Sequence, residues 1–155
     1  MTGGEPLIHP ETIALLEELT KDRRYDVLLE TNGACALTKV STDVHIIMDV
    51  KCPSSAMHNK LLPENFGELK YNDDVKFVVS NREDFEYACS IIAQYGIPSS
   101  GQNCIFSPIL GTLPPAELAK WLVEEYDGST QLASSRIKLG LQLHKILWPT
   151  DPRGR

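Results

Sequence analysis

Short apolar runs rich in β-branched residues alternate with segments of amphipathic helical spacing, and this alternation restricts the fold more than any other feature. Strands are expected at 25–30, 44–49, 75–80, 103–107 and 137–143, and helices at 10–22, 82–94 and 115–125. Parallel strands joined by crossover helices produce this order. The sequence therefore predicts an α/β fold with a parallel sheet whose central strands are buried on both faces. The stretch 54–71 contains Pro63 and Gly67 and is expected to be a loop with one short helix.

Length and charge exclude several classes of protein. The chain has 155 residues and 42% hydrophobic content, which fits one domain spanning 1–155. Its net charge is −6 and no basic stripe is present, so direct nucleic-acid binding is not expected. The longest apolar runs, such as 44–50, are far shorter than the roughly 20 residues that span a bilayer. We therefore expect a cytoplasmic protein without a membrane segment.

The four cysteines do not have the spacing of a metal site. Cys35, Cys52, Cys89 and Cys104 are 17, 37 and 15 residues apart, which matches neither a CxxC pair nor a dense disulfide framework. The sequence predicts four reduced thiols, most of them buried.

Polar residues follow each expected strand at the point where it ends. They are Glu30-Thr31-Asn32-Gly33, Asp49 through Ser55, Ser80-Asn81, Ser107-Pro108, and Gln142 with His144. The carboxyl ends of parallel strands meet at one edge of a sheet, where ligands of such folds bind. The strand ends therefore predict a ligand site.

Each of these segments also has a purely structural interpretation. Asn32-Gly33 is a strong turn signal, and Lys51 would be a solvated lysine at a strand end; in the ligand-binding interpretation, Asp49 orients Lys51 and is not a catalytic acid. Ser80 would belong to a helix N-terminus, and His144 would be a packed histidine. Spacing alone does not decide between these interpretations and ligand binding.

Five motifs in order carry a resemblance to a known family. They are Thr2-Gly3-Gly4-Glu5-Pro6, Glu30-Thr31-Asn32-Gly33, Asp49-Val50-Lys51-Cys52-Pro53-Ser54-Ser55, Lys76-Phe77-Val78-Val79-Ser80 and Gln142-Leu143-His144-Lys145. From Thr2 to about Gly154 the chain resembles 7-carboxy-7-deazaguanine synthase, a radical S-adenosylmethionine enzyme. The resemblance implies a partial (β/α) TIM-like radical S-adenosylmethionine barrel whose first strands are missing. It implies conversion of 6-carboxy-5,6,7,8-tetrahydropterin to 7-carboxy-7-deazaguanine, a step of queuosine biosynthesis by a carbon–nitrogen lyase.

The resemblance also implies roles for individual residues. For the cofactor S-adenosylmethionine these are Gly3, Gly4, Glu5, Lys51 and Ser80, with Ser54 and Ser55 as hydroxyl donors. For the pterin substrate they are Thr2, Glu30, Asn32, Gln142 and His144, with Arg153 from the tail. In the family, the GGE loop receives the methionine ammonium and the lysine contacts S-adenosylmethionine, whose carboxylate can pair with an ammonium. Ser80 is expected to contact a ribose or a carboxylate, and a homodimer is the expected assembly.

The family's [4Fe-4S] cluster is held by three cysteines, with Mg²⁺ bound beside the third, and these 155 residues contain no CxxxCxxC motif. We therefore expect an amino-terminally truncated chain that binds no cluster and cleaves no S-adenosylmethionine. The alternatives are a non-catalytic ligand-binding or interaction domain, completed by strands of a partner chain, and a longer protein in which Met1 is internal. Missing strands would expose unpaired backbone amides and an apolar face, so marginal stability or self-association is expected.

Overall fold

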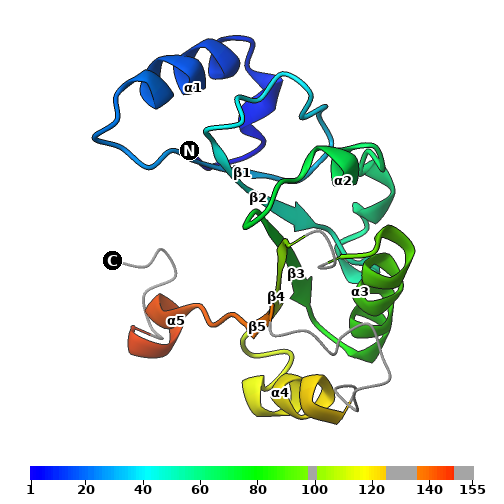
Figure 1. Ribbon diagram of the computed structural model, residues 1–155. Helices are drawn as coiled ribbons and strands as arrows, with labels where there is room; N and C mark the ends of the chain where they lie inside the picture. Colours follow the sequence, from blue (N-terminus) through cyan, green and yellow to red (C-terminus); the bar gives the residue numbers. More distant parts are fainter. Residues whose placement is uncertain (98–100, 125–135, 149–155) are drawn as a thin grey trace.

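The computed structural model describes residues 1–97, 101–124 and 136–148, and its centre is one sheet of five parallel strands (Figure 1). The strands are β1 (Leu28–Thr31), β2 (His45–Val50), β3 (Asp74–Val79), β4 (Asn103–Pro108) and β5 (Ile137–Leu139). They lie in the order β1-β2-β3-β4-β5, so strands adjacent in sequence are adjacent in space. The predicted α/β class and parallel sheet are confirmed, and the arrangement is consistent with a partial TIM-like barrel.

Helices connect or follow the strands. They are α1 (Glu11–Lys21), α2 (Asn65–Glu68), α3 (Arg82–Tyr95), α4 (Pro115–Glu124) and α5 (Leu143–Leu147), with 3₁₀ turns η1 (Pro6–Ile8), η2 (Pro53–Ser55) and η3 (His58–Lys60). In Figure 1, α2 and α3 lie on one side of the sheet, and α5 stands away on the other. No helix in the described ranges has the length and apolar character needed to cross a membrane.

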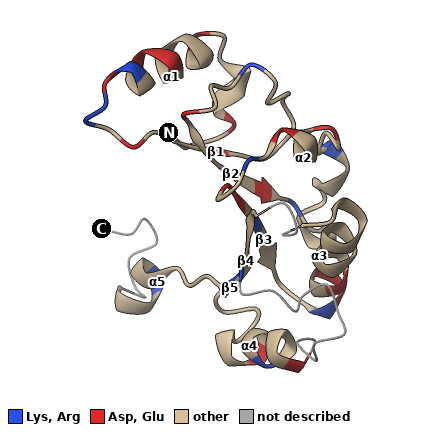
Figure 2. Ribbon diagram, in the orientation of Figure 1, with Lys and Arg blue, Asp and Glu red and all other residues tan. Residues whose placement is uncertain are grey.

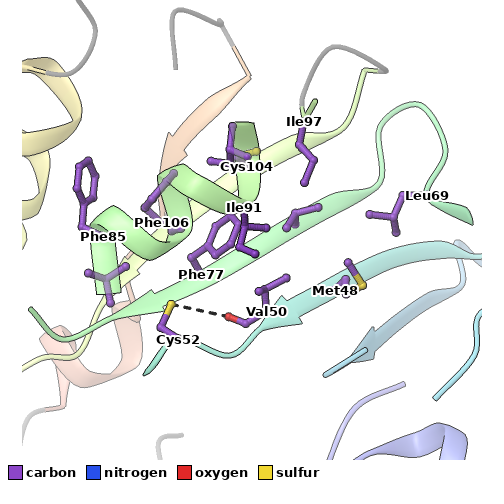
Figure 3. Close-up of a cluster of buried hydrophobic side chains, with 14 of the residues drawn as sticks. Met48, Val50, Cys52, Leu69, Phe77, Phe85, Ile91, Ile97, Cys104 and Phe106 are labelled. Atoms are coloured by element: carbon purple, nitrogen blue, oxygen red, sulfur yellow. Dashed lines mark hydrogen bonds between the residues drawn. The ribbon is translucent and has the colours of Figure 1, made fainter. Parts of the chain in front are cut away.

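The main hydrophobic core lies between the sheet and the helices α3 and α4 (Figure 3). Phe106 of β4 is fully buried, and its ring centroid lies 5.4 Å from that of Phe77 and 5.5 Å from that of Phe85. Trp121 of α4 packs against Phe85 at 5.6 Å. These aromatic contacts hold the two crossover helices against the same face of the sheet.

The prediction that the central strands are buried on both faces is wrong. Along β2 and β3, fully buried residues alternate with half-buried ones. The buried positions face α3 and α4, whereas the opposite face carries Asp49 and Lys76, which are partners in the β2–β3 register. Helices pack on one face, and the other presents charged side chains at the carboxyl half of the strands.

The first residues of the chain extend the sheet beyond β1. The Met1 amino group donates to the Leu28 carbonyl, and the Glu30 amide donates to the Met1 carbonyl at 2.9 Å. This is the hydrogen-bond pattern of a parallel pair. It places the Thr2-Gly3-Gly4-Glu5 segment at the carboxyl end of β1.

The last predicted strand, 137–143, is also only partly correct. β5 ends at Leu139, and helix α5 begins at Leu143, so His144 lies in a helix and not in a strand. Gly140 marks the change: a Cβ there would lie 2.6 Å from Ser107 Oγ and 2.7 Å from Ile105 Cγ2. Leu139, Leu141 and Leu143 recur every second residue, which is the period of a strand, so the pattern alone extended the predicted strand past its end.

Candidate functional site

Most of the predicted site residues line one depression at the carboxyl ends of β1 and β2. Its volume is about 230 Å³. The lining residues are Thr2, Gly3, Gly4, Glu30, Thr31, Asn32, Asp49 and Lys51. A larger depression of about 480 Å³ lies at the opposite ends of these strands, beside Tyr25 and His45, and none of the predicted site residues line it. The predicted convergence of strand ends is therefore present at β1 and β2.

Glu5 anchors the glycine loop rather than projecting into solvent. Its side chain is buried, and its carboxylate accepts hydrogen bonds from the Leu7 amide at 3.1 Å and the Asn32 amide at 2.7 Å. The Thr31 hydroxyl lies 3.0 Å from both carboxylate oxygens. Gly3 and Gly4 have φ of +106° and +62°, a conformation that side chains disfavour. Glu5 thus ties this glycine loop to the end of β1.

Glu30 is held from two sides. The Thr2 hydroxyl donates to Oε2 at 2.6 Å, and Lys76 Nζ of β3 reaches Oε1 at 3.2 Å. The Thr2 hydrogen bond, followed by Lys76 and the charge of Lys51, lowers the pKa of Glu30 despite partial burial. Glu30 is therefore a fixed anion and a hydrogen-bond acceptor. Lys76 carries no predicted role, although a lysine among the apolar residues of 75–79 is a signal that could have found it.

Lys51 and Asp49 form an ion pair at 2.7 Å, as the sequence predicted. One oxygen of Asp49, Oδ1, is buried and has no hydrogen-bond partner among the described residues. Asn32 accepts a hydrogen bond from the Ala34 amide at 2.9 Å, which orients its side-chain amide. The depression therefore combines a cation with an oriented amide, and the unpartnered Asp49 oxygen is buried rather than open to it.

Ser80 and Ser54 meet at a buried carboxylate, Asp84 of α3. Ser80 donates to Asp84 through its amide at 2.9 Å and its hydroxyl at 2.7 Å. Ser54 of η2 donates through its amide at 3.0 Å and its hydroxyl at 2.6 Å. Burial alone would raise the pKa of Asp84, but these hydrogen bonds outweigh it and the pKa lies below its usual value. Asp84 stands in the first turn of the helix expected at 82–94, where an acid is ordinary, so the sequence gives no signal that singles it out.

The predicted role of Ser54 and Ser55 as hydroxyl donors to a ligand needs correction. The Ser54 hydroxyl donates to Asp84, and the Ser55 hydroxyl donates to the Cys52 carbonyl at 2.6 Å. Each hydroxyl carries one hydrogen, and both hydrogens are used within the protein.

Gln142 and His144 do not line the depression. They follow β5, whereas the depression lies at β1 and β2, near the other edge of the sheet. Four strand spacings of about 4.8 Å separate the two edges by roughly 19 Å before any curvature. Arg153 lies outside the described residues.

The cysteines of the described ranges do not fit an iron–sulfur cluster. Burial raises the pKa of the Cys52 and Cys104 thiols to about 12, whereas clusters bind thiolates. Cys52 Sγ lies 4.0 Å from the Val50 carbonyl oxygen inside the core (Figure 3). No group of three or more metal-ligating side chains occurs in the part of the chain that the structure describes.

An all-parallel α/β sheet with acidic, basic and amide groups at the carboxyl ends of its strands is the arrangement of a partial TIM-like barrel domain. Comparison with curated proteins is more specific, although no family model matches the chain. The chain is 36% identical over 166 residues to the 7-carboxy-7-deazaguanine synthase of Koribacter versatilis, covering 99% of this chain and 70% of that protein. It is 37% identical over 158 residues to the same enzyme of Chlorobaculum tepidum (99% and 67% covered) and 32% over 157 residues to that of Clostridium acetobutylicum (99% and 67%).

The chain belongs to the 7-carboxy-7-deazaguanine synthase family, and it is shorter than these relatives. The resemblance inferred from the five motifs is confirmed, and with it the lineage of radical S-adenosylmethionine lyases. The similarity favours the enzyme over the alternative of a non-catalytic ligand-binding or interaction domain.

Proposed function

We propose that this chain supplies the S-adenosylmethionine- and substrate-binding wall of a 7-carboxy-7-deazaguanine synthase. The reaction proposed is conversion of 6-carboxy-5,6,7,8-tetrahydropterin to 7-carboxy-7-deazaguanine in queuosine biosynthesis. The observation that supports it most is the depression in which the glycine loop, Glu30, Asn32 and Lys51 line one surface. These residues come from three separate segments of the chain.

The residues of the depression fit the amino-acid part of S-adenosylmethionine. Lys51 is more than one-third exposed and can pair with a carboxylate, while the partly exposed Glu30 carboxylate suits ammonium or hydroxyl groups. Glu5, which is engaged by Thr31 and Asn32, would hold the glycine loop in the conformation that admits the ligand. When bound, S-adenosylmethionine supplies the adenosyl group used for radical chemistry in this family.

On the substrate side, Thr2, Glu30 and Asn32 are proposed to bind the heterocycle. Glu30 stays ionised because Thr2 and Lys76 hold its carboxylate, so it would accept hydrogen bonds from N–H groups rather than donate a proton. Gln142 and His144 are proposed to reach the substrate from the β5 side. No step is assigned to a [4Fe-4S] cluster or to Mg²⁺, because the described donor groups do not fit either.

A homodimer and the absence of direct nucleic-acid binding complete the proposal. Leu143, Ile146, Leu147 and Trp148 of the α5 region are substantially exposed, and apolar side chains of this kind support an interface. Acidic and basic positions are interspersed over the described ribbon rather than gathered into a basic face (Figure 2).

Calorimetric titration of S-adenosylmethionine into the purified chain tests the proposal. We expect binding by the wild-type chain and about tenfold or greater weakening in Lys51→Met, since a hydrogen bond to a charged group contributes about 1.5–3 kcal/mol. Lys21→Met is the matched control, because Lys21 forms a comparable pair with Glu18 at 2.9 Å on helix α1. No binding by a folded wild-type chain, or equal affinities in the two variants, would contradict the proposed site.

A further inference from the structure

Lys76 connects the middle of β3 to the ligand depression. It lies on the sheet face opposite α3 and α4, and its Nζ donates to Glu30 Oε1 at 3.2 Å. Glu30 lines the depression, whereas none of the described lining residues belongs to β3. The segment 76–80 is one of the five motifs, and the proposed function assigns no ligand contact to its lysine. Any effect of Lys76 on a ligand therefore passes through Glu30.

The ion pair between Lys76 and Glu30 spans a whole strand. β1 and β3 both pair with β2, so they lie two strand spacings apart, roughly 10 Å. The register partners of Glu30 and Lys76 on β2 are Ile47 and Asp49, which lie between them. A short side chain at position 76 could not cover this distance, so the pair requires a cation with the length of lysine or arginine.

Glu30 keeps one acceptor position on each of its carboxylate oxygens. Each oxygen has two lone pairs. The Thr2 hydroxyl uses one on Oε2 at 2.6 Å and Lys76 uses one on Oε1, and no third hydrogen bond to this carboxylate comes from the described residues. Both oxygens can therefore accept at the same time from a ligand that presents two parallel N–H donors, as they would from a guanidinium group.

Stabilisation of the fold accounts poorly for this pair. The side chains of Lys76 and Glu30 are 25% and 36% exposed, and ion pairs that water reaches contribute little to stability. The other acid of the depression is paired separately, since Asp49 binds Lys51 at 2.7 Å. What the Lys76 pair does fix is the orientation of a carboxylate that lines the ligand space.

We infer that Lys76 is a positioning residue, which holds the Glu30 carboxylate so that both of its oxygens accept from one ligand edge with two adjacent N–H donors. The ring N–H and the neighbouring amino group of a pterin form such an edge. A ring with a carbonyl in place of that amino group presents one donor and one acceptor, and its carbonyl oxygen would face a carboxylate oxygen. The inference rests on the proposed binding of the pterin substrate, and it names the part of the ring that Glu30 recognises.

The first test needs no ligand. The Thr2 hydrogen bond, followed by Lys76 and the charge of Lys51, lowers the pKa of Glu30. Carboxyl NMR titration should find a higher pKa of Glu30 in Lys76→Met, which removes a donor and a positive charge, and a lowered pKa again in Lys76→Arg. Lys120→Met is the matched control, because Lys120 pairs with Glu124 at 3.5 Å on helix α4. A wild-type pKa of Glu30 in Lys76→Met would overturn the inference.

The second test compares two probes by calorimetric titration, 6-carboxypterin and 6-carboxylumazine, which differ in the amino group that a carbonyl replaces. We expect the wild-type chain to bind the pterin about tenfold or more tightly, because a hydrogen bond to a charged group is gained. Lys76→Met should lose most of this preference, whereas Lys76→Arg and Lys120→Met should keep it. A wild-type chain that binds both probes equally, or an undiminished preference in Lys76→Met, would overturn the inference.

Two further outcomes are covered. If the wild-type chain binds neither probe, that result counts against the proposed function, and the pKa of Glu30 in Lys76→Met then decides whether Lys76 holds the carboxylate. If Lys76→Met fails to fold, Glu30→Gln carries the affinity measurement. Glutamine has one acceptor oxygen and an NH₂ group, so the preference for the pterin should disappear, and its persistence would overturn the inference.

Discussion

Replacing Glu5 with glutamine separates a loop-holding role from direct ligand contact. The buried carboxylate accepts from two backbone amides, one on each oxygen, at 3.1 and 2.7 Å. Glutamine has one carbonyl oxygen, so its NH₂ group must face either the Leu7 amide or the Asn32 amide. A buried donor left without an acceptor costs about 1–3 kcal/mol.

For a chain of this length, a loss of about 2 kcal/mol lowers the melting temperature by about 4–8 °C. Thermal unfolding followed by circular dichroism measures this shift. Glu17→Gln, which changes an exposed glutamate of helix α1, should leave the melting temperature unchanged. If Glu5→Gln melts like the control yet loses S-adenosylmethionine affinity, then Glu5 contacts the ligand and does not anchor the loop.

Three further predictions concern charge, packing and thiols. In the folded protein the pKa of Glu30 lies below its ordinary value of 4.5, so the ionised carboxylate stabilises the fold above that value, and this contribution is lost as pH falls through the folded pKa. The difference in melting temperature between the wild type and Glu30→Gln should therefore shrink as the solution is acidified from neutrality. A constant difference would refute this. Phe106→Ala should lower the free energy of unfolding by about 3–5 kcal/mol in urea titrations, since the side chain is fully buried, and a loss below about 1 kcal/mol would show that the core collapses into the space. Burial raises the pKa of Cys52 and Cys104 to about 12, so mass spectrometry after treatment of the native chain with an alkylating reagent should find both thiols unmodified. Anaerobic addition of iron and sulfide should give no cluster absorption. Rapid alkylation or a cluster band would contradict this.

The candidate site was predictable where a residue's place along its strand decides its location. Glu30, Asn32 and Lys51 follow neighbouring parallel strands, so the topology brings them to one edge. His144 was not predictable in this way, because its position depends on where β5 ends and how far the sheet curves. The close approach of Gly140 to Ser107, which involves a strand distant in sequence, marks that end.

The sequence by itself determined the class of fold and the family, because these follow from periodicity and from motifs that are local in the chain. Only the tertiary structure decided which polar groups are already occupied. The sequence assigned Glu5 to the cofactor and gave Asp84 no role, yet the Glu5 carboxylate binds residues 26 and 27 positions away and the Asp84 carboxylate binds a serine 30 positions away. A hydrogen bond between such distant residues exists only after the strands have packed, and it determines which atoms remain free for a ligand.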